Sequence, residues 1–281
     1  MPIERVDFPL SLEDFYFRFH TRRRPVVIRT SSLAQLGWQT HLWSNEYLAY
    51  KAGAHEVLVQ KRGSGEYSAE GSAYVPMRFA DFLQRVMARA GGDAGMYLNL
   101  QTNNVLEPPL LQLLGDFSIP PYFKDLTLRC VNLWMGNSDK TIVTPLHHDF
   151  NDNLYVVVEG TKRFTLFPPE QAPNLYPRGQ LQAVEPNGII RYATLSGMPH
   201  LSQVDIHAPD RQRFPRYAEA EPTREDVDIR AGELLFLPAG WFHQVSSTGR
   251  HVAVSFFSVV PGGEELQRMQ ELLARRRGAT A

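Results

Sequence analysis

The sequence predicts a mainly β fold, with an α/β segment on its N-terminal side and a helix on its C-terminal side. From about residue 95, short alternating or apolar runs are separated by Gly, Pro, Asn and Asp, which favour turns. The chain has 281 residues, of which 43% are hydrophobic, so it can bury a large core. The expected strands are 96–100, 128–134, 153–158, 161–167, 233–237, 241–245 and 252–260. Strands of this kind are typical of a sandwich or barrel.

Local patterns in the first third predict helices and a strand. Ser11 and Asp14 have the spacing of a capping box that opens a short helix, and the apolar run 25–28 predicts a strand. An amphipathic helix facing a core is predicted by four apolar residues at i, i+3, i+4 and i+7: Phe79, Phe82, Leu83 and Val86. Residues 1–94 are therefore interpreted as an N-terminal α/β elaboration of the β domain.

The β domain itself is expected to span residues 95–262, with a polar, proline-bearing insertion at about 178–224. Long insertions between core strands often carry binding function. Residues 263–281 follow as a charged helix and tail. Along that helix runs an apolar stripe of Leu266, Met269, Leu272 and Leu273. The stripe would either pack on the body of the protein or pair with a second copy in a homodimer.

Composition excludes several partners and compartments. The formal net charge is −1, which supplies no electrostatic attraction to nucleic acid. Cys130 is the only cysteine, so no disulfide within the chain is expected. No signal-like apolar segment stands near residue 1, and no apolar run reaches membrane-spanning length. These observations predict a cytoplasmic protein without a membrane partner.

Three residues are candidate ligands of a metal site. His147 and Asp149 are two apart, and on a strand the period of two sends both side chains to one face. His243 follows a Pro-x-Gly turn in a later expected strand. Two imidazoles and one carboxylate form the facial triad of non-haem Fe(II) oxygenases, which leaves three positions open for other ligands. Mn(II) or Ni(II) would fit the same triad, whereas tetrahedral zinc sites usually prefer three histidines or cysteines.

Two longer motifs surround these residues. From His147 the sequence reads His-x-Asp-x3-Asn-x6-Gly, which resembles the first cupin motif with Asp149 in place of its second histidine and Asn153 in place of its glutamate. From Gly232 it reads Gly-x5-Pro-x-Gly-x2-His, which matches the second cupin motif and ends at His243. Together with Thr144-Pro-Leu-His147 and Gly160-Thr-Lys-Arg-Phe, these motifs make the chain resemble the JmjC and cupin-like hydroxylases. The resemblance is strongest to the branch that contains the asparaginyl hydroxylase of hypoxia-inducible factor.

This resemblance implies a double-stranded β-helix (jelly-roll) core and a pocket for 2-oxoglutarate. Lys162 shares the apolar face of its strand and therefore needs an anion, unless it snorkels to solvent. The resemblance implies that Lys162 binds the distal carboxylate of 2-oxoglutarate, helped by Thr144 and Tyr97. Asn153 is expected either beside the metal and co-substrate or at the start of a strand.

The expected activity is that of an Fe(II)- and 2-oxoglutarate-dependent oxygenase, which consumes dioxygen, releases succinate and CO2, and hydroxylates a C–H bond. The favoured substrate is an amino-acid side chain in a peptide or protein. The alternatives are a small metabolite, a tRNA base, and a non-catalytic cupin-fold metal-binding module. His148 is expected to point away from the metal by alternation. The remaining histidines, including His200, His207 and His251, have no partner at ligand spacing and are interpreted as surface or core residues.

Overall fold

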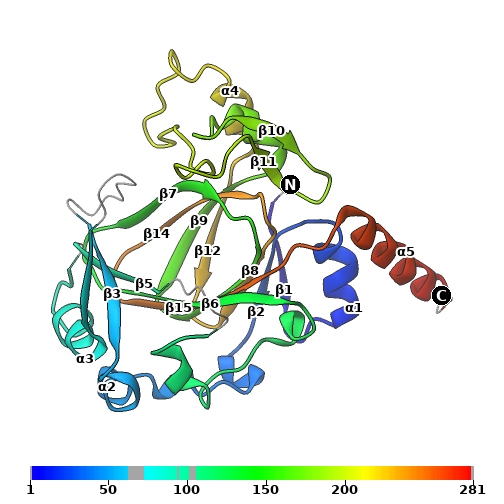
Figure 1. Ribbon diagram of the computed structural model, residues 1–281. Coiled ribbons are helices and arrows are strands. Elements are labelled where there is room, and N and C mark those ends of the chain that lie inside the picture. Colours follow the sequence, from blue (N-terminus) through cyan, green and yellow to red (C-terminus); the bar gives the residue numbers. More distant parts are fainter. Residues whose placement is uncertain (1, 63–72, 94, 101–105, 280–281) are drawn as a thin grey trace.

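The computed structural model describes residues 2–62, 73–93, 95–100 and 106–279. Within them, two β-sheets face each other, as Figure 1 shows. The predicted jelly-roll architecture is confirmed.

In the described chain, the larger sheet has nine strands in the order β1-β2-β13-β8-β15-β6-β5-β3-β4. β1 and β2 are parallel, and the other neighbours are antiparallel. The strands are β1 (Glu4–Asp7), β2 (Val26–Arg29), β3 (Glu56–Lys61), β4 (Ala73–Arg78), β5 (Met96–Leu100), β6 (Leu128–Gly136), β8 (Asp152–Glu159), β13 (Glu233–Leu237) and β15 (His251–Ser258). Strands from the first 94 residues thus extend both edges of this sheet instead of forming a layer of their own.

The smaller sheet is antiparallel and has the order β12-β9-β14-β7. Its strands are β7 (Ile142–His148), β9 (Thr161–Phe167), β12 (Glu225–Arg230) and β14 (Phe242–Ser247). Alternation on β9 explains how this sheet is oriented: Phe164 and Leu166 are buried between the sheets, while Arg163 faces outward near Asp226 and Asp228. The site is built in this interior.

The outer face of the larger sheet is covered by helical segments that precede β6, which bury an aromatic-rich core. They are α1 (Leu12–Phe15), η1 (Tyr16–His20), η2 (Leu33–Leu36), η3 (Thr40–Leu42), α2 (Asn45–Ala52), α3 (Phe79–Phe82), η4 (Leu83–Met87), η5 (Leu110–Leu113) and η6 (Pro121–Phe123). Ser11 caps α1 as predicted, since its side chain accepts a hydrogen bond from the Asp14 N–H. The run from Phe79 to Val86 is helical as predicted, although its second half has π-helical hydrogen bonding.

The outer face of the smaller sheet is covered by the segment between β9 and β12, at the top of Figure 1. Its elements are η7 (Pro169–Asn174), β10 (Leu181–Val184), β11 (Ile190–Tyr192), α4 (Tyr217–Ala220) and η8 (Glu221–Thr223). Tyr192 and Tyr217 from this segment pack with Phe167 and Phe242 of the sheet. Burial on both faces explains why the strands of the smaller sheet contain few exposed apolar residues.

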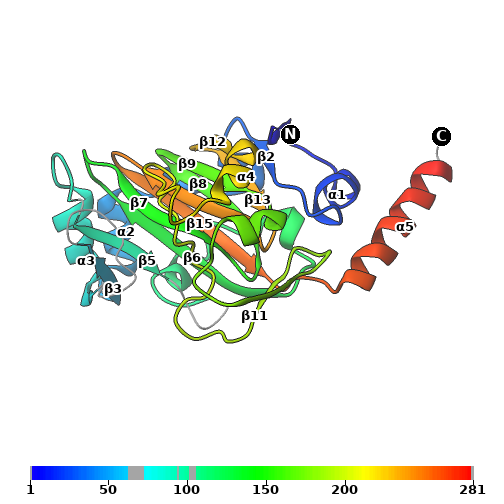
Figure 2. The same ribbon diagram turned by 90° about the horizontal axis from the view of Figure 1, so that it is seen from above.

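The last helix, α5 (Gly263–Ala279), extends away from the sandwich along the side of α1 in Figure 2. Leu266 and Leu273 are buried, whereas Leu272 is half exposed. Arg277 forms ion pairs with Glu13 and Asp14. The stripe therefore packs partly on its own chain. Among the described residues, no helix has both the length and the hydropathy to cross a membrane.

Candidate metal centre

The structure brings His147, Asp149 and His243 together. One candidate ligand atom from each lies within 4.8 Å of the others, and His243 Nε2 is 3.6 Å from an Asp149 carboxylate oxygen. His147 and His243 are directly paired in the register of β7 and β14. Asp149 lies one residue beyond the end of β7, so strand alternation alone does not orient it. Its carbonyl instead accepts a hydrogen bond of 3.0 Å from the Gly240 N–H, which joins the two ligand-bearing turns.

Both histidines are oriented by the backbone. His147 Nδ1 lies 2.7 Å from the Pro145 carbonyl oxygen, and His243 Nδ1 lies 3.0 Å from the Trp241 carbonyl oxygen. A carbonyl oxygen only accepts, so each Nδ1 must carry the proton and donate it. The lone pair of each imidazole is therefore on Nε2, the nitrogen available to a metal.

The protonation states of the two histidines and the aspartate favour the binding of a cation. Burial, with the neighbouring His243, lowers the pKa of His147 to about 3. Burial also lowers the pKa of His243 to about 4, so both imidazoles are neutral at neutral pH. For Asp149, desolvation raises the pKa while the nearby imidazoles oppose the shift. A divalent ion between these groups would stabilise the carboxylate and use both free Nε2 lone pairs. The donor set fits Fe(II), Mn(II) or Ni(II).

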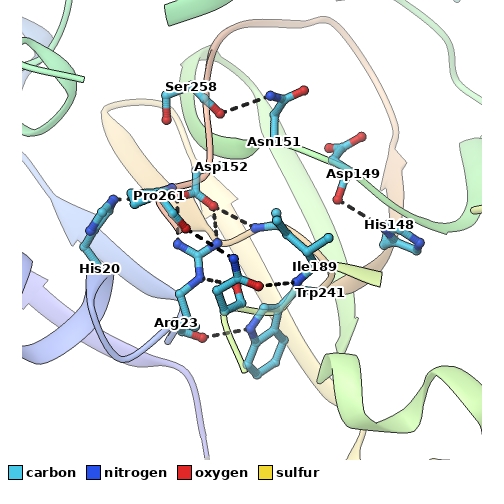
Figure 3. A network of polar contacts seen from close by, with 12 residues as sticks. His20, Arg23, His148, Asp149, Asn151, Asp152, Ile189, Trp241, Ser258 and Pro261 are labelled. Carbon is cyan, nitrogen blue, oxygen red and sulfur yellow. Dashed lines mark hydrogen bonds and ion pairs between the residues drawn. The ribbon is translucent and has the colours of Figure 1, made fainter. Parts of the chain in front are cut away.

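A buried network fixes the turns that carry Asp149 and His243 (Figure 3). Asp152 accepts two hydrogen bonds from the Arg23 guanidinium and one of 2.9 Å from the Ala239 N–H. The Trp241 indole N–H donates to the Arg23 carbonyl at 3.0 Å. Arg23 Nε donates to the Asn187 carbonyl, which ties in the inserted segment. Arg23 and Asp152 together thus connect the turn after Asp149, the turn before His243 and the insertion.

His20, beside this network, predicts a pH dependence of stability. Burial lowers its pKa to about 4, against the opposing pull of Asp152, whose charge Arg23 already balances. Below pH 6.5 the unfolded chain binds a proton that folded His20 does not, so the free energy of unfolding falls as the pH drops towards 4. The expected loss is ~1.4 kcal/mol per pH unit from this group, or about 2 kcal/mol at pH 5.

We expect His20→Phe to remove that contribution, measured in the metal-free protein by urea unfolding at pH 7 and pH 5. Phenylalanine keeps the stacking on Phe236, and neither ring nitrogen of His20 has a hydrogen-bond partner within the described chain. His41→Asn, at an exposed histidine, is the matched control and should leave the difference between the two pH values unchanged. An equal pH dependence in wild type and His20→Phe would contradict the prediction.

Lys162 is 1% exposed, so it does not snorkel to solvent. Its Nζ donates to the Tyr97 hydroxyl at 3.1 Å and to the Ser247 hydroxyl at 3.2 Å. Tyr97, Thr144 and Asn153 line an inner cavity of about 50 Å³ together with the three candidate ligands. Three of the four residues expected to bind the co-substrate thus line one cavity with the candidate ligands, and Lys162 is joined to that cavity through its hydrogen bond to Tyr97.

The structure adds residues that the sequence pattern did not single out. Ser247 and the buried His251 lie 3.2 Å apart, beside Lys162, so His251 is a core residue as expected but belongs to this polar group. His200 lies against the metal cluster, because Leu201 pairs with His147 outside the named strands and the Ser202 N–H donates to Leu146. No spacing signal marks His200, since only the path of the insertion brings it there. His148 points away from the cluster, as predicted, and bonds to the Tyr192 hydroxyl at 2.7 Å.

A jelly-roll interior that presents two imidazoles and a carboxylate at converging positions defines a cupin-type metal centre. The chain belongs to the cupin-like domain family, whose model matches residues 13–258. It is 31% identical over 276 residues to the bifunctional peptidase and (3S)-lysyl hydroxylase JMJD7 of Homo sapiens, covering 92% of this chain and 84% of that protein. It is 34% identical over 204 residues to the JmjC domain-containing protein 4 of Schizosaccharomyces pombe, covering 65% of this chain and 42% of that one.

A third relative is the tRNA wybutosine-synthesizing protein 5 of Homo sapiens, 26% identical over 273 residues, with 92% of this chain and 78% of that protein covered. The predicted relationship to the JmjC and cupin-like hydroxylases is confirmed. The chain is accordingly a 2-oxoglutarate-dependent oxygenase of the JmjC type.

Proposed function

We propose that this protein binds Fe(II) through His147, Asp149 and His243 and hydroxylates a C–H bond on an amino-acid side chain of a peptide or protein. The observation that carries the proposal is the pairing of that cluster with a buried lysine. Lys162 contacts hydroxyl groups, and no carboxylate of the described chain forms an ion pair with it. A buried ammonium without a counter-ion is costly, so the site is complementary to an incoming anion.

The dicarboxylate 2-oxoglutarate fits a site that has a metal cluster at one end and the Lys162 ammonium at the other. Burial lowers the pKa of the Lys162 ammonium, with a smaller effect from Arg62, and a carboxylate placed against it would restore the charge. Tyr97 and Ser247 orient the ammonium, because their hydroxyl oxygens accept its hydrogen bonds. Thr144 and Asn153, on the wall of the inner cavity, complete the proposed co-substrate site.

Bound iron(II) would supply the oxidation chemistry, in which dioxygen and 2-oxoglutarate are consumed, succinate and CO2 are released, and one C–H bond becomes C–OH. The protein's part is positional. The backbone carbonyls at Pro145 and Trp241 hold both imidazoles with Nε2 inward, and Lys162 sets the direction of the co-substrate.

A peptide or protein substrate is supported by a relative of which this chain covers 84%, a named (3S)-lysyl hydroxylase. A homodimer through α5 is not part of the proposal, because Leu266 and Leu273 are already buried in the single chain. We propose the cytoplasm as the compartment, on the ground of the single cysteine.

The test is succinate formation from labelled 2-oxoglutarate by purified protein with Fe(II) and ascorbate, together with calorimetric binding of 2-oxoglutarate to the Mn(II)-loaded protein. Absence of both succinate and binding would overturn the proposal and leave a non-catalytic metal-binding module.

We expect Lys162→Met to weaken 2-oxoglutarate binding by roughly 100-fold, the effect of losing a charge-assisted hydrogen bond of ~3 kcal/mol. Methionine fills a similar volume without the charge, and Mn(II) affinity should stay unchanged. Lys140→Met, at an exposed lysine, is the matched control. Calorimetry with 2-oxoglutarate decides the matter, and an unaltered affinity in Lys162→Met would exclude Lys162 as the carboxylate-binding residue.

A further inference from the structure

His148 lies between the candidate ligands His147 and Asp149, and its ring bonds at both nitrogens. The side chain is 0% exposed. Its Nδ1 lies 3.1 Å from the Asp149 carbonyl oxygen, a contact drawn in Figure 3, and its Nε2 lies 2.7 Å from the Tyr192 hydroxyl. Burial lowers the pKa of His148 to about 3, so the ring is neutral at neutral pH.

The acceptors determine the direction of both hydrogen bonds. A carbonyl oxygen only accepts, so Nδ1 of His148 carries the ring proton and donates it to Asp149. In a neutral ring the other nitrogen, Nε2, is then an acceptor, and the Tyr192 hydroxyl donates to it. The hydroxyl of Tyr192 thus favours the one tautomer of His148 that can bond to the Asp149 carbonyl.

The Asp149 carbonyl has two donors that fix its direction. Asp149 lies one residue beyond the end of β7. Its carbonyl accepts from the Gly240 N–H at 3.0 Å and from the His148 ring at 3.1 Å, which uses both lone pairs of the oxygen. The Asp149 carboxylate carbon is only two bonds from Cα, so the position of the backbone limits where its oxygens can lie. A metal site needs its ligands held within about 0.5 Å of the required geometry.

Tyr192 belongs to the inserted segment, 44 residues from His148 along the chain. It is the last residue of β11 and is paired with Leu181 of β10. Its ring is 7% exposed and lies in the apolar cluster that contains Phe167 and Phe242. The hydroxyl therefore reaches His148 from a packed position that the fold of the insertion provides.

The insertion also bonds to the backbone beside the ligands. The His148 N–H donates to the His200 carbonyl at 3.3 Å, and the Ser202 N–H donates to the Leu146 carbonyl at 2.9 Å. Since β7 is an edge strand of the smaller sheet, these bonds add a short piece of the insertion to that edge. The insertion thus holds His148 through its main chain and through its ring.

We propose that His148 and Tyr192 are positioning residues for the ligand Asp149. The Tyr192 hydroxyl orients the His148 ring, and the ring holds the Asp149 carbonyl so that the carboxylate remains in the cluster. The inserted segment is thereby part of the metal centre, although it supplies none of the three candidate ligands. The inference rests on the proposed function, because it concerns how the proposed Fe(II) ligands are held.

The first test removes a single oxygen atom. We expect Tyr192→Phe to weaken Mn(II) binding by roughly 10-fold and to change the electron paramagnetic resonance line shape of the bound ion, because the ligand geometry loosens. Tyr217→Phe is the matched control and should match wild type in both measurements. Tyr217 lies in the same apolar cluster, is 0% exposed, and its hydroxyl has no hydrogen-bond partner within the described chain.

The second test separates the hydrogen bond to Asp149 from the packing of the ring. His148→Leu removes the donor and should weaken Mn(II) binding by roughly 10–100-fold. His148→Asn places an amide N–H where Nδ1 lies and should bind Mn(II) roughly fivefold more tightly than His148→Leu, the effect of one hydrogen bond. Stability alone favours the opposite order, because leucine suits a buried apolar site better than asparagine does.

Thermal unfolding of the metal-free proteins is measured alongside. A merely structural role would lower the unfolding temperature of Tyr192→Phe and leave its Mn(II) affinity and line shape as in wild type, which would overturn the inference. Equal Mn(II) affinities of His148→Asn and His148→Leu would overturn it as well. Absence of Mn(II) binding to the wild-type protein would instead overturn the proposed function, and the inference with it, so the two failures are distinguishable.

Discussion

The His243→Ala protein is expected to fold and to lose both metal binding and succinate formation. His243 supplies one of the two imidazole Nε2 atoms of the cluster. Removing a residue that is hydrogen-bonded to a metal ligand usually reduces metal affinity or activity by roughly 10–100-fold. Removing a ligand itself should reduce them by more than ~100-fold. Activity is measured as succinate per enzyme, and metal as the stoichiometry and affinity of Mn(II) by electron paramagnetic resonance.

The matched control is His207→Ala. His207 is an exposed histidine whose ring contacts the side chain of Gln244, the neighbour of His243, and it lies outside the cluster. It should retain wild-type Mn(II) affinity and succinate formation. Full Mn(II) occupancy in His243→Ala would show that the ion is held elsewhere.

The candidate ligands were predictable because each motif carries its own geometry. The Gly-x5-Pro-x-Gly-x2-His motif contains both the ligand His243 and Gly240. Gly240 has a positive φ of 83° at the end of the turn, so the motif predicts the turn as well as the ligand. Lys162 was predictable from alternation, since Phe164 and Leu166 on the same face had to be buried. These inferences needed only contacts within one strand or one turn.

Contacts between strands were not predictable in the same way. Asn99 lies opposite Trp134 because β5 pairs with β6 in that register. Ser247 reaches Lys162 because β14 lies beside β9. A shift of register by one residue would turn each of these side chains to the other face, and a single sequence does not determine the register. The β12 strand is absent from the expected strands because its exposed positions carry acidic residues, and the pairing of Asp226 and Asp228 with Arg163 is visible only in the structure.

Gly240→Ala is expected to destabilise the protein by more than ~3 kcal/mol and to weaken Mn(II) binding. A Cβ at this position would lie 1.8 Å from the Gly188 carbonyl oxygen, which is backbone and cannot swing aside. The positive φ adds its own strain. Relief requires the turn before His243 to move away from the insertion, which also breaks the hydrogen bond from the Gly240 N–H to Asp149.

Gly37→Ala separates these two costs. Gly37 has a similar φ of 77°, but a Cβ there would meet nothing within 4 Å. It should therefore lose only ~1 kcal/mol, the conformational penalty alone, and keep its Mn(II) affinity. Urea unfolding of the metal-free proteins measures the difference, and Mn(II) titration measures its effect on the cluster. If both variants lose the same stability, the contact with Gly188 is not tight. If Gly240→Ala loses stability but binds Mn(II) normally, the turn supports the fold without positioning the ligands. We expect only Gly240→Ala to lose both stability and Mn(II) affinity. The missing side chain of Gly240 lets the backbone of the His243 turn contact both the backbone of the insertion at Gly188 and the Asp149 carbonyl.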